Sequence, residues 1–160
     1  MRYSKFDPNS PRAQRGIKFQ EYVLDDLRNA GMMATPIREW LQRVSPEITE
    51  SAMNKQEKML GDIVIVSPSD GSLVFVECCS MLEGKETRFP ASKTENFNGI
   101  LRWYALGWDG IDNVVFARSE SWNRYVNKTT RDGAYYVFPA KYITTFNAAE
   151  RGAKDFAKCL

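Results

Sequence analysis

The chain has 160 residues, no histidine, three cysteines and a formal net charge of +2. This length suits one domain that buries its own core without disulfides or metals to support it. The absence of histidine excludes Ser-His-Asp and Cys-His catalysis, His-ligated zinc and imidazole general bases. Any hydrolytic chemistry must therefore use carboxylates, lysine, water and a hard cation.

The cysteines and the apolar runs indicate a reduced, cytoplasmic protein. Cys78 and Cys79 are adjacent and Cys159 is penultimate, which suits neither a disulfide framework nor a zinc site. The longest apolar runs are too short to span a membrane, and the N-terminus lacks a secretory hydrophobic region. We expect one domain over residues 1–160, with no membrane partner and with residues 1–9 loosely ordered.

The first half of the chain predicts two helices with a strand between them. Ser10 and Pro11 form an N-cap and N1 pair, and Gly31 is a C′ glycine, so a helix is expected from Pro11 to about Ala30. Glu21 lies at the edge of its apolar arc. A strand broken by Pro36 is expected over residues 32–40, and Ser45-Pro46 is expected to cap a helix through residue 58.

A β-hairpin follows. The β-branched run GDIVIVS begins at Gly61, the turn SPSDGS comes next, and LVFVECC from Leu73 is a second apolar run of strand length. Both runs are nearly continuously apolar, which indicates a sheet covered by helices on both faces.

The second half predicts a covering helix, two strands and a short terminal helix. Ser92 to Glu95 is a capping box, and the apolar spacing after it predicts a helix to about Leu106. Strands are expected in NVVFARS from Asn113 and in AYYVFPA, and the terminal helix from about Asn147. The fold class is therefore α/β, with a central mixed β-sheet flanked by helices.

Two carboxylates carry the candidate chemistry. Asp62 opens the first hairpin strand and Glu77 lies at the end of the second, so the two are expected to be neighbours. Adjacent carboxylates repel unless they share a proton or a cation, and their oxygens suit Mg²⁺ or Mn²⁺. Such a metal lowers the pKa of bound water and polarises a phosphoryl oxygen, which favours phosphodiester hydrolysis.

The order of these segments resembles that of the PD-(D/E)XK nucleases, including small Holliday junction resolvases and restriction endonucleases. It consists of an acidic helix residue, then GDIVI, then VFVECC, then an amphipathic helix and a strand. The resemblance covers residues 11–119 and implies a restriction-endonuclease-like αβββαβ core with C-terminal additions. It also implies a Mg²⁺-dependent endonuclease acting on DNA, with Asp62, Glu77 and Glu21 around the metal.

Cys79 stands where the family motif has its lysine. A thiol cannot supply the missing positive charge. Lys93 is the candidate substitute, because on a helical wheel it lies near the apolar stripe that faces the sheet, and it resembles the relocated lysines of divergent family members. Lys85 is an alternative.

Cations mixed with aromatics after the predicted strand at residue 113 are typical of nucleic-acid contacts, although a solvated segment has the same composition. The candidates are Arg118, Arg124, Lys128 and Arg131. Three functions remain open: an active nuclease, which could act as a homodimer to reach two strands; an inactive nuclease-fold protein that binds nucleic acid or serves assembly; and an unrelated α/β interaction domain.

Overall fold

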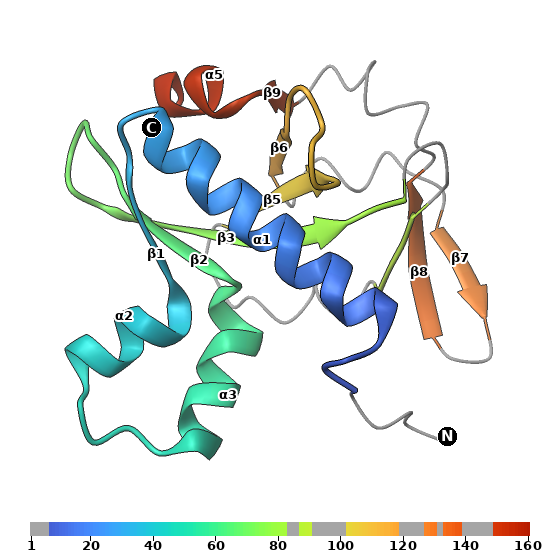
Figure 1. Cartoon of the computed structure of the whole chain (residues 1–160), viewed down its shortest axis with the longest axis horizontal. Coiled ribbons are helices and arrows are strands. Elements are labelled where there is room, and N and C mark those ends of the chain that lie inside the picture. Colours follow the sequence, from blue (N-terminus) through green and yellow to red (C-terminus); the bar gives the residue numbers. More distant parts are fainter. Residues whose placement is uncertain (1–6, 83–86, 91–101, 119–126, 131–132, 139–148) are drawn as a thin grey trace.

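The computed structural model describes residues 7–82, 87–90, 102–118, 127–130, 133–138 and 149–160. Within these residues a six-stranded sheet has the order β1-β2-β3-β5-β6-β9, and a three-stranded sheet has the order β4-β8-β7. Figure 1 shows the long helix α1 lying across the larger sheet, with α2 and α3 at one end of the molecule. The expected class, an α/β domain with a mixed sheet flanked by helices, is confirmed.

The elements of the larger sheet and its helices are α1 (Pro11–Asn29), β1 (Met33–Pro36), α2 (Ile37–Val44), α3 (Glu50–Leu60), β2 (Ile63–Val66), β3 (Leu73–Ser80), β5 (Arg102–Gly107), β6 (Val115–Arg118), β9 (Ala149–Arg151) and α5 (Ala153–Lys158). The smaller sheet contains β4 (Thr87–Pro90), β7 (Asn127–Thr130) and β8 (Gly133–Phe138). Strands β3 and β5 are parallel, and the other described pairs are antiparallel.

The first helix has the caps that the sequence predicts. The Ser10 hydroxyl accepts a hydrogen bond of 3.2 Å from the backbone N–H of Ala13, and Gly31 has the left-handed φ of +87° expected after a helix. The helix buries Phe19 and Val23 against the sheet, together with Leu27. Its predicted position is confirmed.

The predicted boundaries of the next elements are wrong. The strand ends at Pro36, and α2 begins at Ile37 because proline at the preceding position suits a helix start better than continued pairing. Ser45 closes α2 instead of opening α3. Thr49 is the N-cap of α3, and its hydroxyl accepts a hydrogen bond of 3.2 Å from Ala52 N–H.

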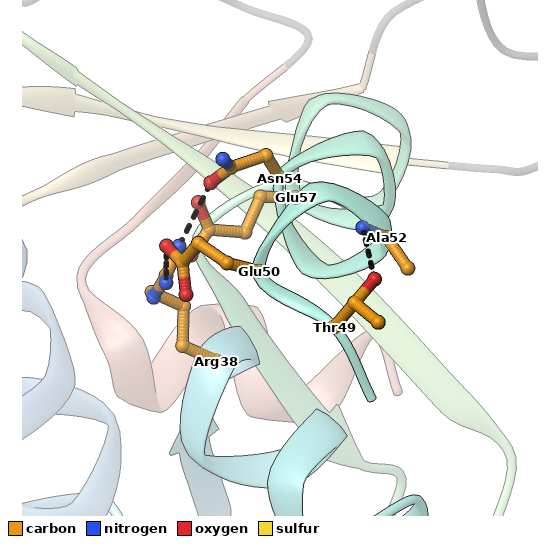
Figure 2. A network of polar contacts seen from close by, with 6 residues as sticks. All are labelled: Arg38, Thr49, Glu50, Ala52, Asn54 and Glu57. Atoms are coloured by element: carbon orange, nitrogen blue, oxygen red, sulfur yellow. Dashed lines mark hydrogen bonds and ion pairs between the residues drawn. The ribbon is translucent and has the colours of Figure 1, made fainter. Parts of the chain in front are cut away.

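Arg38 joins α2 to α3 through polar contacts. Figure 2 shows its guanidinium directed at Glu50 and Glu57, with Asn54 beside them. Exposed ion pairs of this kind contribute little stability. The two helices are held chiefly by an apolar cluster that also covers one face of the sheet: Ile37, Leu41, Met53, Leu60 and Val64.

The helix expected from residue 92 to about Leu106 is wrong over its last part. Residues 102–107 form β5, which pairs with β3 on one side and β6 on the other. Residues 91–101 lie outside the described residues. Every residue of β5 is buried, and a run that is apolar on both sides fits a central strand as well as a helix face. Pairing with two neighbours decides in favour of the strand.

The C-terminal predictions are confirmed for the strands but not for the start of the helix. NVVFARS contains β6, and AYYVFPA contains most of β8. The terminal helix begins at Ala153 rather than near residue 147, because β9 comes first and Gly152 turns the chain with a φ of +84°. No helix among the described residues is long and apolar enough to cross a membrane.

Gly61 controls how closely β2 approaches β3. Its φ is +111°, and a Cβ at this position would lie 2.8 Å from the carbonyl oxygen of Val76. We expect Gly61→Ala to lower the free energy of unfolding by about 3 kcal/mol, measured by urea denaturation, because the strained φ and the backbone clash add.

Gly71→Ala is the matched control. Gly71 also has a positive φ, +74°, but a Cβ there would meet nothing within 4 Å. Its cost should be about 1 kcal/mol. Equal losses for the two variants would show that close contact at Gly61 is unimportant.

Candidate functional site

The β2–β3 hairpin places Asp62 opposite Glu77. Ile63 pairs with Val76 in the antiparallel register, so the residues just before and just after them face each other. The backbone N–H of Asp62 donates a hydrogen bond of 2.8 Å to the Val76 carbonyl. Asp62 therefore lies beside the stretch from Val76 to Cys78, which contains Glu77, so the predicted proximity of the two residues holds at the level of the backbone.

The Asp62 carboxylate is fixed by the neighbouring strand. Its Oδ2 accepts a hydrogen bond of 2.8 Å from the backbone N–H of Cys78. An acidic residue at the start of a strand commonly makes such a local hydrogen bond to the backbone. It also orients the carboxylate, as the surroundings of a metal ligand must.

Arg102 is a residue of the candidate site that the sequence prediction missed. Its Nη1 lies 3.3 Å from Glu77 Oε2, and the two side chains are 1% and 12% exposed. Its Nη2 donates a hydrogen bond of 3.2 Å to the Tyr104 hydroxyl. Tyr104 is the register partner of Glu77 across the parallel pair, so strands β3 and β5 present these three side chains on one face of the sheet.

This pairing changes the charge of the site. The two carboxylates and the Arg102 guanidinium carry a formal charge of −1 together, and the positive charge comes from the adjacent strand β5. The sequence signal was a single arginine beginning the apolar run RWYALG. Because the sequence predicted a helix for that run, the position of Arg102 next to Glu77 was not foreseen.

The neighbouring polar groups stay neutral. Burial, and then the nearby Asp62 carboxylate, raise the pKa of the Cys78 thiol well above its ordinary value. Burial likewise raises the pKa of Tyr104 to about 12, although Arg102 opposes the shift. Neither side chain therefore adds negative charge beside the carboxylates near neutral pH.

Glu21 is not brought together with the other carboxylates. It is exposed on α1, which packs on the sheet face formed by Ile63 and Val76. Phe75 and Glu77 share the opposite face by strand alternation. Glu21 instead borders a pocket of about 290 Å³ with Ile17, Gln20, Leu24 and Pro36. Among the described residues, no group of three or more His, Cys, Asp or Glu side chains is positioned for a metal.

The remaining candidates are mostly beyond the described residues. Arg118 is exposed at the end of β6, with its Cζ 5.0 Å from the centre of the Trp103 ring. Lys128 lies in β7, of which the backbone alone is described. Outside the described residues lie Lys85, Lys93, Arg124 and Arg131.

The donors at the hairpin fit Mg²⁺ in kind. Asp62 and Glu77 offer hard oxygen atoms, and Mg²⁺ in proteins is commonly held by one or two carboxylates together with water and phosphate oxygens. Asp62 has a fixed orientation, while Arg102 engages one oxygen of Glu77. These two residues are the ones that would hold the ion.

The buried ion pair predicts a large loss of stability when Arg102 is replaced. Arg102→Met should lower the free energy of unfolding by about 3–5 kcal/mol, because it removes a buried charge partner of the nearly buried Glu77 carboxylate. The double variant with Glu77→Met should lose much less than the sum of the single losses. Urea denaturation of the three variants measures this.

Arg43→Met is the control, since Arg43 pairs with Glu39 on exposed α2. It should cost less than about 1 kcal/mol. Additive losses at Arg102 and Glu77 would contradict a coupled pair.

The thiols should differ in reactivity. Cys159 is exposed, Cys79 is buried and Cys78 is half-buried with a raised pKa. In the native protein at mildly alkaline pH, Cys159 should react with a disulfide reagent about tenfold or more faster than the other two. Cys159→Ser should remove the fast phase, and persistence of that phase would contradict the neutral state inferred for Cys78.

Comparison with known proteins gives no identification. No protein-family model matches the chain, and no curated protein matches its sequence. The candidate site is therefore defined by the chain's own geometry: two opposed carboxylates at a strand boundary and a buried guanidinium on the adjacent parallel strand.

Proposed function

We propose that this protein is a metal-dependent nuclease that hydrolyses phosphodiester bonds in DNA, with a PD-(D/E)XK-like arrangement. The order of the described elements supports the proposal. A helix is followed by three antiparallel strands, β1, β2 and β3, and then by β5 parallel to β3. These elements match the first helix and the three following strands that the resemblance implies, with α2 and α3 inserted after the first strand. The helix that it implies before the next strand would fall in residues 91–101, outside the described residues.

The observation that carries the proposal is the opposition of Asp62 and Glu77 across the hairpin. Two carboxylates at one boundary of a buried sheet are unfavourable without a cation. Arg102 pairs with Glu77. A divalent ion held by both carboxylates would further offset their mutual repulsion.

Each residue of the proposed metal centre has a different role. Asp62 and Glu77 hold the ion, with Asp62 oriented by the Cys78 backbone. Bound Mg²⁺ or Mn²⁺ supplies an acidified water and polarises a phosphoryl oxygen. Arg102 limits the negative charge that DNA meets on approach. Lys93 is proposed from its sequence position to orient the nucleophile, and Glu21 has no part in this centre.

A second candidate is an inactive nuclease-fold protein that binds nucleic acid. The Arg102–Glu77 ion pair favours it, because this contact could replace a metal in stabilising Glu77. Cys79 at the motif lysine position favours it as well.

Cleavage assays with matched variants decide between the candidates. The wild type, incubated with supercoiled, branched and single-stranded DNA in Mg²⁺ or Mn²⁺, should cut at least one substrate. Asp62→Asn and Glu77→Gln should lower the rate by about 100-fold or more, because each removes a charged metal ligand while keeping the side-chain shape. Lys93→Ala should also slow the reaction.

Asp25→Asn, at an exposed position on α1, is the control and should leave the rate unchanged. Cleavage that survives Asp62→Asn would refute the proposed centre. If no DNA is cut, calorimetric titration with Mn²⁺ still tests the ion site, and DNA binding without cleavage would support the second candidate.

A further inference from the structure

A second site lies at the carboxyl ends of the parallel strands β3 and β5. A pocket of about 240 Å³ opens there beside the N-terminal half of α1. Its described walls are Arg15, Lys18, Ser80, Met81, Leu82, Trp108 and Asp109. The ends of parallel strands are favoured positions for ligands in open α/β sheets.

One wall of the pocket is cationic. Arg15 and Lys18 are three residues apart on α1, so they lie on the same side of the helix. Both are exposed, and neither forms an ion pair with any residue that the structure describes. Their charges are therefore available to an anionic ligand.

Another part of the pocket lining carries an aromatic ring packed on the core. Trp108 is half-buried and packs against the main apolar core. It begins a turn in which Ile111 N–H donates a hydrogen bond of 3.0 Å to the Trp108 carbonyl. The Tyr22 hydroxyl donates a hydrogen bond of 2.5 Å to the Ile111 carbonyl, which ties this turn to α1.

The end of β3 is joined to the end of β5 by a backbone hydrogen bond. Met81 N–H donates a hydrogen bond of 2.7 Å to the Gly107 carbonyl, directly before Trp108. The ring, the strand ends and the cationic helix are thus held in one arrangement. A ligand would not need to order these described parts of the lining.

The pocket is also polarised. Asp109 lies in its lining, and the carboxylates of Asp26, Asp109 and Asp112 add to burial in raising the pKa of Tyr22. Negative charge therefore gathers near the Tyr22 side. An anionic group would be repelled there and attracted to Arg15 and Lys18.

We propose that this pocket binds a segment of single-stranded nucleic acid, with one base stacked on Trp108 and an adjacent phosphate between Arg15 and Lys18. Stacking on a fixed aromatic ring beside backbone-binding cations is how proteins hold single strands without reading their sequence. The choice of ligand class rests on the proposed function. Met81 comes four positions after Glu77, about 13 Å along a strand. The pocket is bordered by α1 and Glu77 lies on the other sheet face, so the two sites are separate.

Binding is measured with the full chain and a fluorescently labelled oligo-dT in EDTA, where metal-dependent cleavage cannot occur. Trp108→Leu keeps an apolar side chain on the core but removes the stacking face, and should weaken binding by about tenfold. Arg15→Gln with Lys18→Gln should lower the slope of log affinity against log salt by about 0.7, since the pair holds one phosphate and each phosphate contact on a single strand contributes about 0.7.

Lys55→Gln with Lys58→Gln is the matched control, because it removes the same charge from exposed positions on α3. It should leave the affinity nearly unchanged, and a duplex of the same length should bind more weakly because its bases are already stacked. Equal losses for the two double variants, unchanged binding by Trp108→Leu, or no binding by the wild type would each refute the pocket. Because no metal is present, these outcomes are independent of whether the protein cleaves DNA.

Discussion

The ion pair between Arg102 and Glu77 constrains the centre of the sheet. A guanidinium that is 1% exposed has lost nearly all its water, and this desolvation is unfavourable unless a carboxylate and further acceptors replace the solvent. Glu77 and the Tyr104 hydroxyl are such acceptors. Strand β5 must therefore lie parallel to β3 in a register that keeps Arg102 within reach of Glu77.

The same contact sets the chemistry available to the carboxylates. Glu77 cannot be considered apart from Arg102, because any ion that binds it competes with or shares this partner. Asp62 is constrained differently, through the Cys78 backbone and the close approach at Gly61. One carboxylate is thus held by charge and the other by backbone geometry. In the proposed metal centre, Asp62 is therefore oriented by the backbone and Glu77 by the Arg102 guanidinium.

The sequence predicts the hairpin well because local signals agree there: β-branched runs, a turn rich in Ser, Asp and Gly, and register that follows from the turn. The opposition of Asp62 and Glu77 follows from those signals alone. Arg102 could not be found in the same way. The residues around it fit a helical spacing, and their burial in a strand depends on β3 and β6, which are distant in sequence. The predicted start of α3 was wrong for a smaller reason. Ser45 and Thr49 are both acceptable N-cap residues, and only the turn between them decides which one begins the helix.

The carboxylate site and the pocket lie at different positions along the parallel strands β3 and β5. Along β3, the carboxylate and guanidinium charges meet on one face at Glu77, and a few residues later the strand ends at a pocket bordered by cations and a fixed tryptophan. The cations of Arg15 and Lys18 attract an anion at the second position, whereas the first position is lined by carboxylates. The two proposals therefore place nucleic-acid binding at the pocket and metal-dependent chemistry at Asp62 and Glu77.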